Sequence, residues 1–159
     1  MKSLFFATAL LLTVISTNAQ KSALRFQGGL NVGIPAYNLD GTNLGLGVDL
    51  LAHYSVATQV AITGDIGYTA LLGKNGAGTS NLIPIRAGLR FYPSESFFVA
   101  GKIGAGIISN DGSSVTTTAY SFGLGYKFDK KLELGGSYDA YSKNGTVGLI
   151  NLRLGYFFN

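Results

Sequence analysis

The sequence predicts an all-β protein: an eight-stranded antiparallel up-and-down transmembrane β-barrel, preceded by a cleaved signal peptide. Three observations support this prediction. Apolar residues recur at every second position in eight separate segments, which is the period of a strand with one apolar face. The other face of these segments holds the charged residues. The first 19 residues have the pattern of an export signal.

The export signal has three parts. Lys2 supplies a positive start, residues 4–15 are apolar, and Thr17, Asn18 and Ala19 form a small-residue cleavage site. The apolar run is shorter than the roughly 20 residues that a membrane-spanning helix needs. We therefore predict a signal peptide over residues 1–19 and one barrel domain over residues 20–159.

The composition excludes several classes of function. Charged residues make up 13% of the chain, against about 25% in typical soluble domains. The net charge is +4, but the basic residues are scattered, so no nucleic-acid partner is predicted. The chain has no Cys and one His, which argues against disulfides, thiol chemistry and a transition-metal site. We predict no cofactor and no metal.

Eight segments alternate strictly. In the last of them, Leu152, Leu154 and Tyr156 are apolar, and Asn151 and Arg153 lie between and before them. Strand side chains point to opposite faces in turn, so each segment has an apolar face and a polar face. The segments are residues 24–34, 44–55, 59–68, 83–91, 97–107, 120–128, 131–139 and 150–158.

The connections predict the orientation of the barrel. Short turns are expected at residues 56–57, 92–96 and 128–131. Longer loops rich in Gly and Asn are expected at residues 35–43, 73–80, 109–117 and 142–146. Short periplasmic turns and longer external loops are typical of outer-membrane barrels. We therefore predict that the protein lies in the outer membrane with both termini in the periplasm.

Alternation alone fits two barrels, one with an apolar exterior in membrane lipid and one with an apolar pocket, as in a soluble lipocalin-like carrier. The polar face holds most of the strand glycines, which suits a crowded lumen, and the charges of both signs. Aromatic residues of the apolar face gather near strand ends, as in the girdles at membrane interfaces. These observations favour membrane lipid around the barrel. The predicted girdle is Phe26, Tyr54, Phe91, Phe97, Tyr126, Phe128, Tyr156 and Phe158.

The polar face predicts a lumenal charge network. If the second and third strands turn at Ala57, Asp49 faces Asp65, and these like charges need a cation. Arg86 and Arg90 on the next strand are the candidates. The network either fills the barrel and fixes its register, or forms a mildly cationic, anion-preferring constriction. Its members are Arg25, Asp49, Asp65, Arg86, Arg90, Lys102, Glu133, Asp139 and Arg153, with Lys127 and Lys131 on the same face.

Two further patterns were considered as chemical sites. His53 and Ser55 have the spacing of a base and a nucleophile, but they lie on the lumenal face near a short turn, away from the outer leaflet. Asp40 and Asp111 lie in loops with Asn and Gly, which is an ordinary turn composition. We therefore predict that the protein is not an enzyme and has no calcium site.

The chain resembles the small outer-membrane β-barrel domain proteins of Gram-negative bacteria, in particular the PorT-like porin-family group. Three segments carry the resemblance: residues 81–92 (NLIPIRAGLRFY), 123–128 (GLGYKF) and 152–159 (LRLGYFFN). The resemblance implies recognition of an aromatic-ended last strand by the outer-membrane assembly machinery. Here Asn159 follows Phe158, so the aromatic residue is the penultimate one. The motifs imply no catalytic residues.

The predicted function is a structural or surface-interaction role through short extracellular loops, with an unknown extracellular partner. The first alternative is a narrow, weakly anion-preferring pore. The second is a soluble carrier of an apolar ligand, which would place the apolar face inside the barrel.

Overall fold

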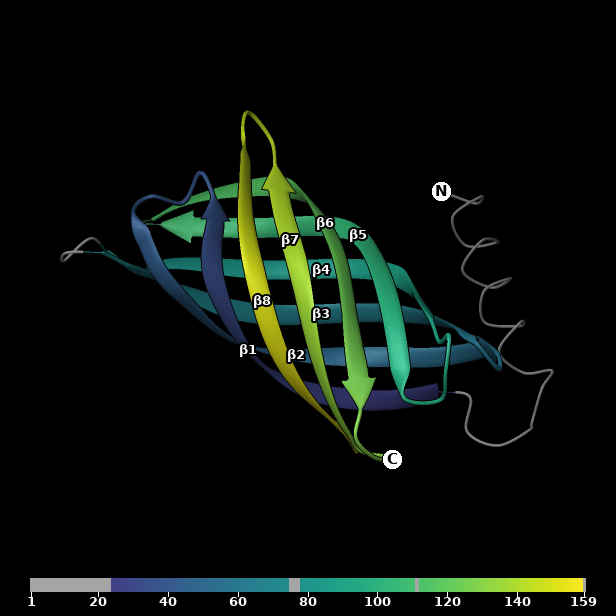
Figure 1. Ribbon diagram of the computed structural model, residues 1–159. Helices are drawn as coiled ribbons and strands as arrows, with labels where there is room; N and C mark the ends of the chain where they lie inside the picture. Colours follow the sequence, from purple (N-terminus) through teal and green to yellow (C-terminus); the bar gives the residue numbers. More distant parts are fainter. Residues whose placement is uncertain (1–23, 75–77, 111, 159) are drawn as a thin grey trace, which may run out of the picture.

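The residues that the structure describes form a closed barrel of eight antiparallel strands, in a computed structural model that covers residues 24–74, 78–110 and 112–158 (Figure 1). The predicted signal peptide, residues 1–19, lies outside the described residues. The strands are β1 (Leu24–Tyr37), β2 (Thr42–Ala57), β3 (Val60–Gly73), β4 (Ser80–Phe91), β5 (Phe97–Asn110), β6 (Ser113–Lys127), β7 (Leu132–Ser142) and β8 (Thr146–Phe157).

Every strand pairs with its neighbour in the chain, and β8 returns to pair with β1, as between Leu154 and Leu30. The front and back walls cross at a steep angle, as the strand tilt of a closed barrel requires (Figure 1). Closure pairs backbone N–H and C=O groups on both sides of each strand, which a sheet in hydrocarbon needs. Among the described residues, no helix has the length and apolar character to cross a membrane.

Both ends of the described chain lie at the same end of the barrel. The Phe158 N–H donates to the Phe26 carbonyl oxygen over 3.0 Å, so the start of β1 and the end of β8 are side by side. This end, which also carries the connections 58–59, 92–96 and 128–131, is called the turn end below. The opposite end, with the connections 38–41, 74–79, 111–112 and 143–145, is the loop end.

The predicted contrast between short turns and long loops is wrong. The strands run further toward the loop end than the alternation indicates, so connections at both ends are of similar length. Residues 113–117, predicted as loop, belong to β6. The first four of them are exposed on both faces of the strand, so nothing in their environment requires an apolar side, and the alternation stops before the strand does.

The apolar face points outward. Leu30, Ile103 and Phe122 are between 61 and 65% exposed, although they lie within paired strands. A contiguous apolar exterior of this extent suits hydrocarbon and not water. The alternative of a soluble, lipocalin-like carrier, which needs these residues inside the barrel, is therefore wrong.

Candidate functional site

The lumen is divided into three layers along the barrel axis. A hollow mouth lies at the turn end, a layer of buried charges lies in the middle, and an apolar layer lies toward the loop end. Neighbouring strands run in opposite directions around the closed barrel. Each layer is therefore built from inward-facing side chains that lie far apart in the sequence. The charged layer was predicted, the apolar layer was not.

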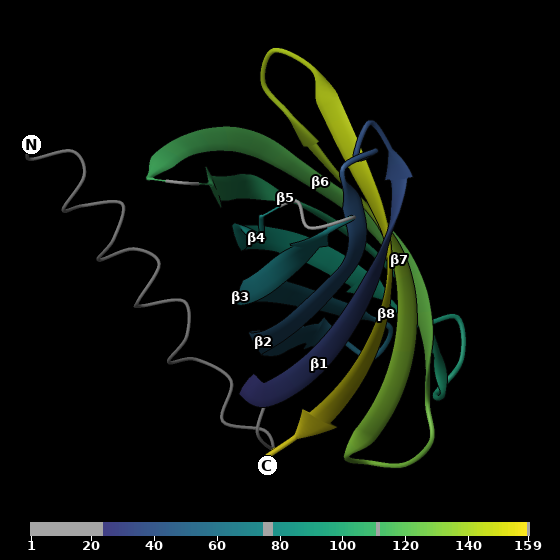
Figure 2. The same ribbon diagram turned by 90° about the vertical axis from the view of Figure 1, so that its left-hand side faces the viewer.

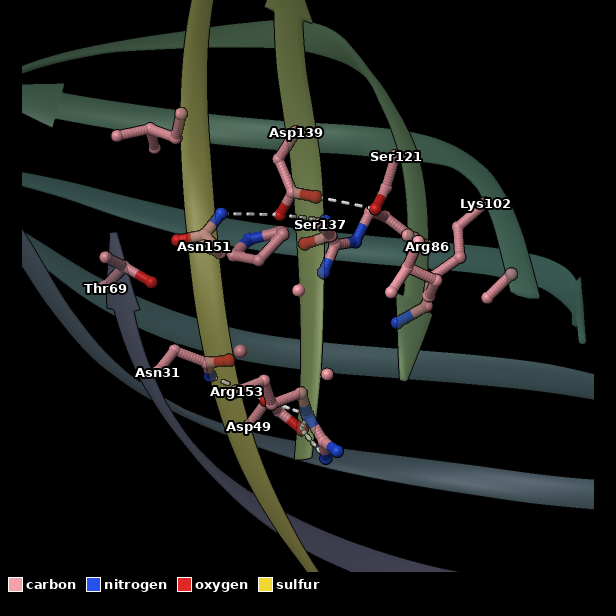
Figure 3. A pocket seen from close by; sticks show the side chains of 18 of the residues that line it. Asn31, Asp49, Thr69, Arg86, Lys102, Ser121, Ser137, Asp139, Asn151 and Arg153 are labelled. Carbon is pink, nitrogen blue, oxygen red and sulfur yellow. Dashed lines mark hydrogen bonds and ion pairs between the residues drawn. The ribbon is translucent and has the colours of Figure 1, made fainter. Parts of the chain in front are cut away.

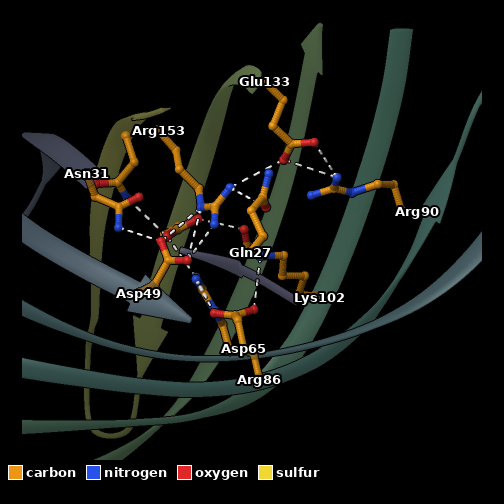
Figure 4. Close-up of polar contacts among 12 residues, drawn as sticks. Gln27, Asn31, Asp49, Asp65, Arg86, Arg90, Lys102, Glu133 and Arg153 are labelled. Atoms are coloured by element: carbon orange, nitrogen blue, oxygen red, sulfur yellow. Dashed lines mark hydrogen bonds and ion pairs between the residues drawn. The ribbon is translucent and has the colours of Figure 1, made fainter. Parts of the chain in front are cut away.

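The first half of the charged layer centres on Arg153 of β8 (Figure 4). Its Nη2 lies 2.6 Å and its Nε 2.8 Å from the two carboxylate oxygens of Asp49. Its Nη1 donates to Gln27 over 2.8 Å and lies 3.3 Å from Glu133. Arg90 pairs with the same Glu133 at 2.9 Å. Arg90 and Glu133 are 2% and 1% exposed, so this pair is screened from water.

The second half centres on Arg86 of β4. The guanidinium lies 2.8 Å from Asp65 on β3 and 2.7 Å from Asp139 on β7. Lys102 of β5 pairs with Asp65 at 2.9 Å. Ser121 donates to Asp139 over 2.6 Å. Asp139 therefore has partners on two sides, and Arg86 joins opposite walls of the barrel (Figure 3).

The predicted facing of Asp49 and Asp65 is wrong. The connection between β2 and β3 is residues 58–59, so the register is displaced: Asp49 lies opposite Gly67, and Asp65 lies opposite Leu51. Each carboxylate then meets a different cation. Arg86 pairs with Asp65 as the sequence suggested, whereas Asp49 is held by an arginine from the last strand.

Three predicted lumenal cations, Arg25, Lys127 and Lys131, lie outside the charged layer, and Lys127 lines the mouth. Arg25 lies at the mouth, where it donates to the Lys130 carbonyl over 2.5 Å and stacks on Phe157 at 3.9 Å. Lys131 lies in the last turn, 5.7 Å from the ring of the outward-facing Tyr156. The layer itself holds four carboxylates and four cations in its ion pairs, so it has no excess charge to favour an anion. This balance argues against the anion-preferring constriction.

The apolar layer fills the lumen beyond the charges. Its buried members come from β3, β4, β6, β7 and β8, and a residue of the first loop, Leu39, packs against them. The alternation predicts one polar face on each strand and so does not indicate this apolar layer. The signal was present as leucines at inward positions close to the predicted loops. The cluster is Leu71, Leu82, Ala119, Tyr141 and Leu149, with Ile108 and Val147 at its edge.

These two layers leave little free space. The cavity between them has a volume of about 70 Å³, enough for a few water molecules. Asn151 closes one side of it by donating to Asp139 over 3.0 Å (Figure 3). An eight-stranded barrel is just wide enough for its own side chains, and here those side chains fill it.

The mouth is larger and is floored by rings. The His53 Nε2 lies 2.9 Å from the Tyr92 hydroxyl, and the His53 ring is edge-on to Tyr92 and Phe157, each at 5.9 Å. Burial raises the pKa of the Tyr92 phenol, which follows β4. Ser55 lines the same mouth, but among the described residues no carboxylate hydrogen-bonds to the His53 ring to orient it as a base.

Comparison with known families decides the class of this barrel. The profile of the outer membrane protein beta-barrel domain matches residues 6–158, which is nearly the whole chain. The chain belongs to this family. It is therefore an outer-membrane β-barrel, in contact with membrane lipid on its apolar face. Membership of the PorT-like group within it stays a prediction.

Solved outer-membrane barrels have the same fold. Ail, the attachment invasion locus protein of Yersinia pestis, is 23% identical, with a TM-score of 0.61 over 85% of this chain and 97% of that one. Neisserial surface protein A is 16% identical, with a TM-score of 0.62 over 86% and 96%. The N-terminal barrel of Pseudomonas aeruginosa OprF is 17% identical, with a TM-score of 0.60 over 84% and 97%. No curated protein sequence matches.

On this outer-membrane barrel, the eight residues of the predicted girdle lie toward the turn end on strands or turns. Two pairs of them stack edge to face: Tyr126 with Phe128 at 5.5 Å and Tyr156 with Phe158 at 6.3 Å. Phe26 and Phe91 are 50 and 45% exposed. Their interfacial role stays a prediction. The predicted girdle does not include the aromatic residues that face inward at this end, Tyr92, Phe98 and Phe157.

Proposed function

We propose that this outer-membrane barrel is a closed scaffold that presents a β-ribbon for interaction at the cell surface. Its loop end faces outward and both termini face the periplasm. The last strand, which ends beside Phe158, is the segment that the assembly machinery would read. The observation that carries the surface role is a free strand edge on β6 at the loop end (Figure 2).

The free edge consists of residues 113–117. They pair with β5 on one side, up to the pair of Asn110 with Ser113. On the other side, β7 reaches only to Thr118, opposite Ser142. The unpaired stretch is about 17 Å long at the usual rise of a strand. Its sequence, SSVTT, has no charge and no Pro, the two features that commonly protect an edge from another strand.

Strand addition is therefore the mode of binding that this edge supports. The partner that fits is an extended segment of another protein, held by main-chain hydrogen bonds. The solved barrel of Ail has been obtained with the heparin analogue sucrose octasulfate. The loop end of this chain carries Asp40 as well as Lys74 and Lys143, so its charges are mixed and favour a peptide over a polyanion.

The strand-addition proposal is tested on cells that express the full chain, with a fluorescent peptide of alternating threonine and valine as the probe. We expect binding above that of cells without the protein, and none with an N-methylated peptide. Successive residues of a strand direct their N–H groups to opposite sides. One of Val115 and Thr116 therefore directs its N–H to β5, and the other directs it to the unpaired edge. Of the variants Val115→Pro and Thr116→Pro, the one that removes the N–H at the unpaired edge should abolish binding.

The same cells test the orientation. An epitope inserted after Gly112 should be labelled on intact cells, whereas one inserted after Glu95, at the turn end, should be labelled only after permeabilisation. Wild-type cells that bind no more peptide than control cells, or two proline variants that bind like the wild type, would contradict the surface role. The reverse labelling pattern would contradict the orientation.

The closed lumen leads to a separate prediction against the pore alternative. We expect the purified barrel to give no single-channel current across many insertions in a planar bilayer, because the charged and apolar layers leave a cavity of only about 70 Å³ in the lumen. Repeated, uniform conductance steps would show that the lumen opens.

A further inference from the structure

The mouth at the turn end has the properties of a ligand site that the scaffold role does not need. Its volume is about 610 Å³, within the range of small-molecule pockets and far larger than the cavity of about 70 Å³ in the lumen. It is lined by β1, β2, β6 and β8 and by all three turns of this end. The buried rings of His53 and Phe157 and the ring of Tyr92 form its floor.

Three cationic residues line this mouth: Arg25, Lys127 and Lys130. The Lys127 ammonium lies 5.1 Å from the centre of the Tyr92 ring. Among the described residues, no carboxylate lies within ion-pair distance of Lys127: Glu133 lies opposite it on β7, but the Glu133 carboxylate pairs with Arg90 and Arg153. The Lys127 charge is therefore available to a ligand.

The two acidic residues of the mouth, Glu95 and Asp129, leave an excess of one positive charge among the charged residues that line it. Asp129 caps its own turn: the N–H groups of Lys131 and Leu132 donate to it over 2.6 and 2.7 Å. These hydrogen bonds hold the pKa of Asp129 below its ordinary value, so it stays ionised and engaged with the backbone. Glu95 is exposed in the neighbouring turn, with no ion pair among the described residues.

The floor contains one unsatisfied polar atom. His53 is 5% exposed, and its Nε2 is engaged with Tyr92, but its Nδ1 is buried without a hydrogen-bond partner among the described residues. If Nε2 accepts from the phenol, Nδ1 carries the proton and is a donor without an acceptor. Buried donors without acceptors are rare in folded proteins, so the His53 ring, which lines the mouth, is an unusual polar feature of this floor.

We infer that the turn-end mouth binds a phosphate ester. A lysine ammonium and an arginine guanidinium are the groups that proteins use for phosphate, and the aromatic floor offers a surface for the organic part of the ester. A bare ion would leave most of the mouth empty. The inferred binding site does not depend on which way the barrel faces in the membrane. The source of the ester does depend on the proposed orientation: with the turn end in the periplasm, it is a phospholipid headgroup of the inner leaflet or a free periplasmic metabolite.

The experiment separates these two sources. Calorimetric titration of the refolded full barrel in a zwitterionic detergent uses glycerol 3-phosphate as the free ester, with glycerol as the uncharged control. Native mass spectrometry of the barrel, released from nanodiscs with equal phosphatidylglycerol and phosphatidylcholine, measures the retained lipid. Binding in the first arm assigns a soluble ester, and selective retention of phosphatidylglycerol in the second assigns a lipid headgroup.

The variants are Lys127→Gln in the mouth and Lys143→Gln at the loop end, which makes the same change of charge. We expect Lys127→Gln to weaken the binding at least tenfold in the arm that gives a signal, and Lys143→Gln to leave it unchanged. Folding of both variants is checked by the mobility shift on gels without boiling. No binding in either arm, or equal binding by the two variants, would overturn the inference.

Discussion

Replacing Arg153 with leucine is expected to lower the free energy of unfolding by about 3–5 kcal/mol, the cost of breaking a buried ion pair from one side. Arg153 makes the bidentate contact with Asp49 and also reaches Gln27. Without it, the buried Asp49 carboxylate keeps, among the residues that the structure describes, only the side-chain hydrogen bond from Asn31, at 2.6 Å. The measurement is urea unfolding of the refolded barrel in lipid vesicles.

The matched control is the double variant Asp49→Asn with Arg153→Leu. Removing the carboxylate charge together with its partner leaves no uncompensated ion, so the double variant should recover a substantial part of the loss. Glu133 stays paired with Arg90 in both variants. A single variant as stable as the wild type, or a double variant less stable than the single one, would show that the Arg153 contact does not stabilise the barrel.

Much of this fold follows from the sequence because one physical condition repeats along the chain. Hydrocarbon outside and a crowded lumen inside impose a period of two on every strand. Residues such as Leu30, Ile103 and Phe122 could be assigned to the exterior on this ground, and they lie there. The count of strands, their antiparallel order and the direction of the apolar face followed from the same pattern.

The alternation predicts less about the structure where a strand no longer has hydrocarbon on one face and a crowded lumen on the other. Beyond the membrane both faces of a strand meet water, so nothing imposes an alternation on residues 113–116, which are exposed on both faces, and their sequence predicts a loop. The register between β2 and β3 depends on which two residues form the turn, and the alternation does not determine that. A shift of the turn from Ala57 to residues 58–59 was enough to separate Asp49 from Asp65.

The alternation of apolar and polar residues does not predict which side chains meet across the lumen. Alternation indicates that Arg90 and Glu133 both face inward, but it does not give their heights or which pairs meet. Their contact joins β4 and β7 on opposite walls. Because a slip of one residue would turn either charge toward lipid, such pairs also make alternative registers costly. We therefore expect the network to fix the register that local pairing leaves open.

Replacing Gly104 with valine is expected to prevent stable folding. Gly104 faces the lumen on β5, opposite Arg86 on β4. A Cβ atom at this position would meet the carbonyl oxygen of Ile85, and it would lie 2.7 Å from the Cα of Arg86. These neighbours are backbone atoms of a paired strand, which cannot rotate away as a side chain can. Relief requires β4 and β5 to separate, so the cost should reach or exceed the roughly 1–3 kcal/mol of ordinary overpacking.

The same strand provides the control. Gly101 faces outward, and a Cβ atom there would meet nothing within 4 Å. Gly101→Val adds the same atoms to β5 and suits a strand better than glycine, so it should fold like the wild type. The folded fraction is read from the mobility of unboiled samples after refolding into vesicles, and the unfolding midpoint from urea titration. Equal folding of the two variants would mean that the close approach of β4 and β5 at Gly104 is not required, and that the lumen tolerates a wider barrel than its packed side chains indicate.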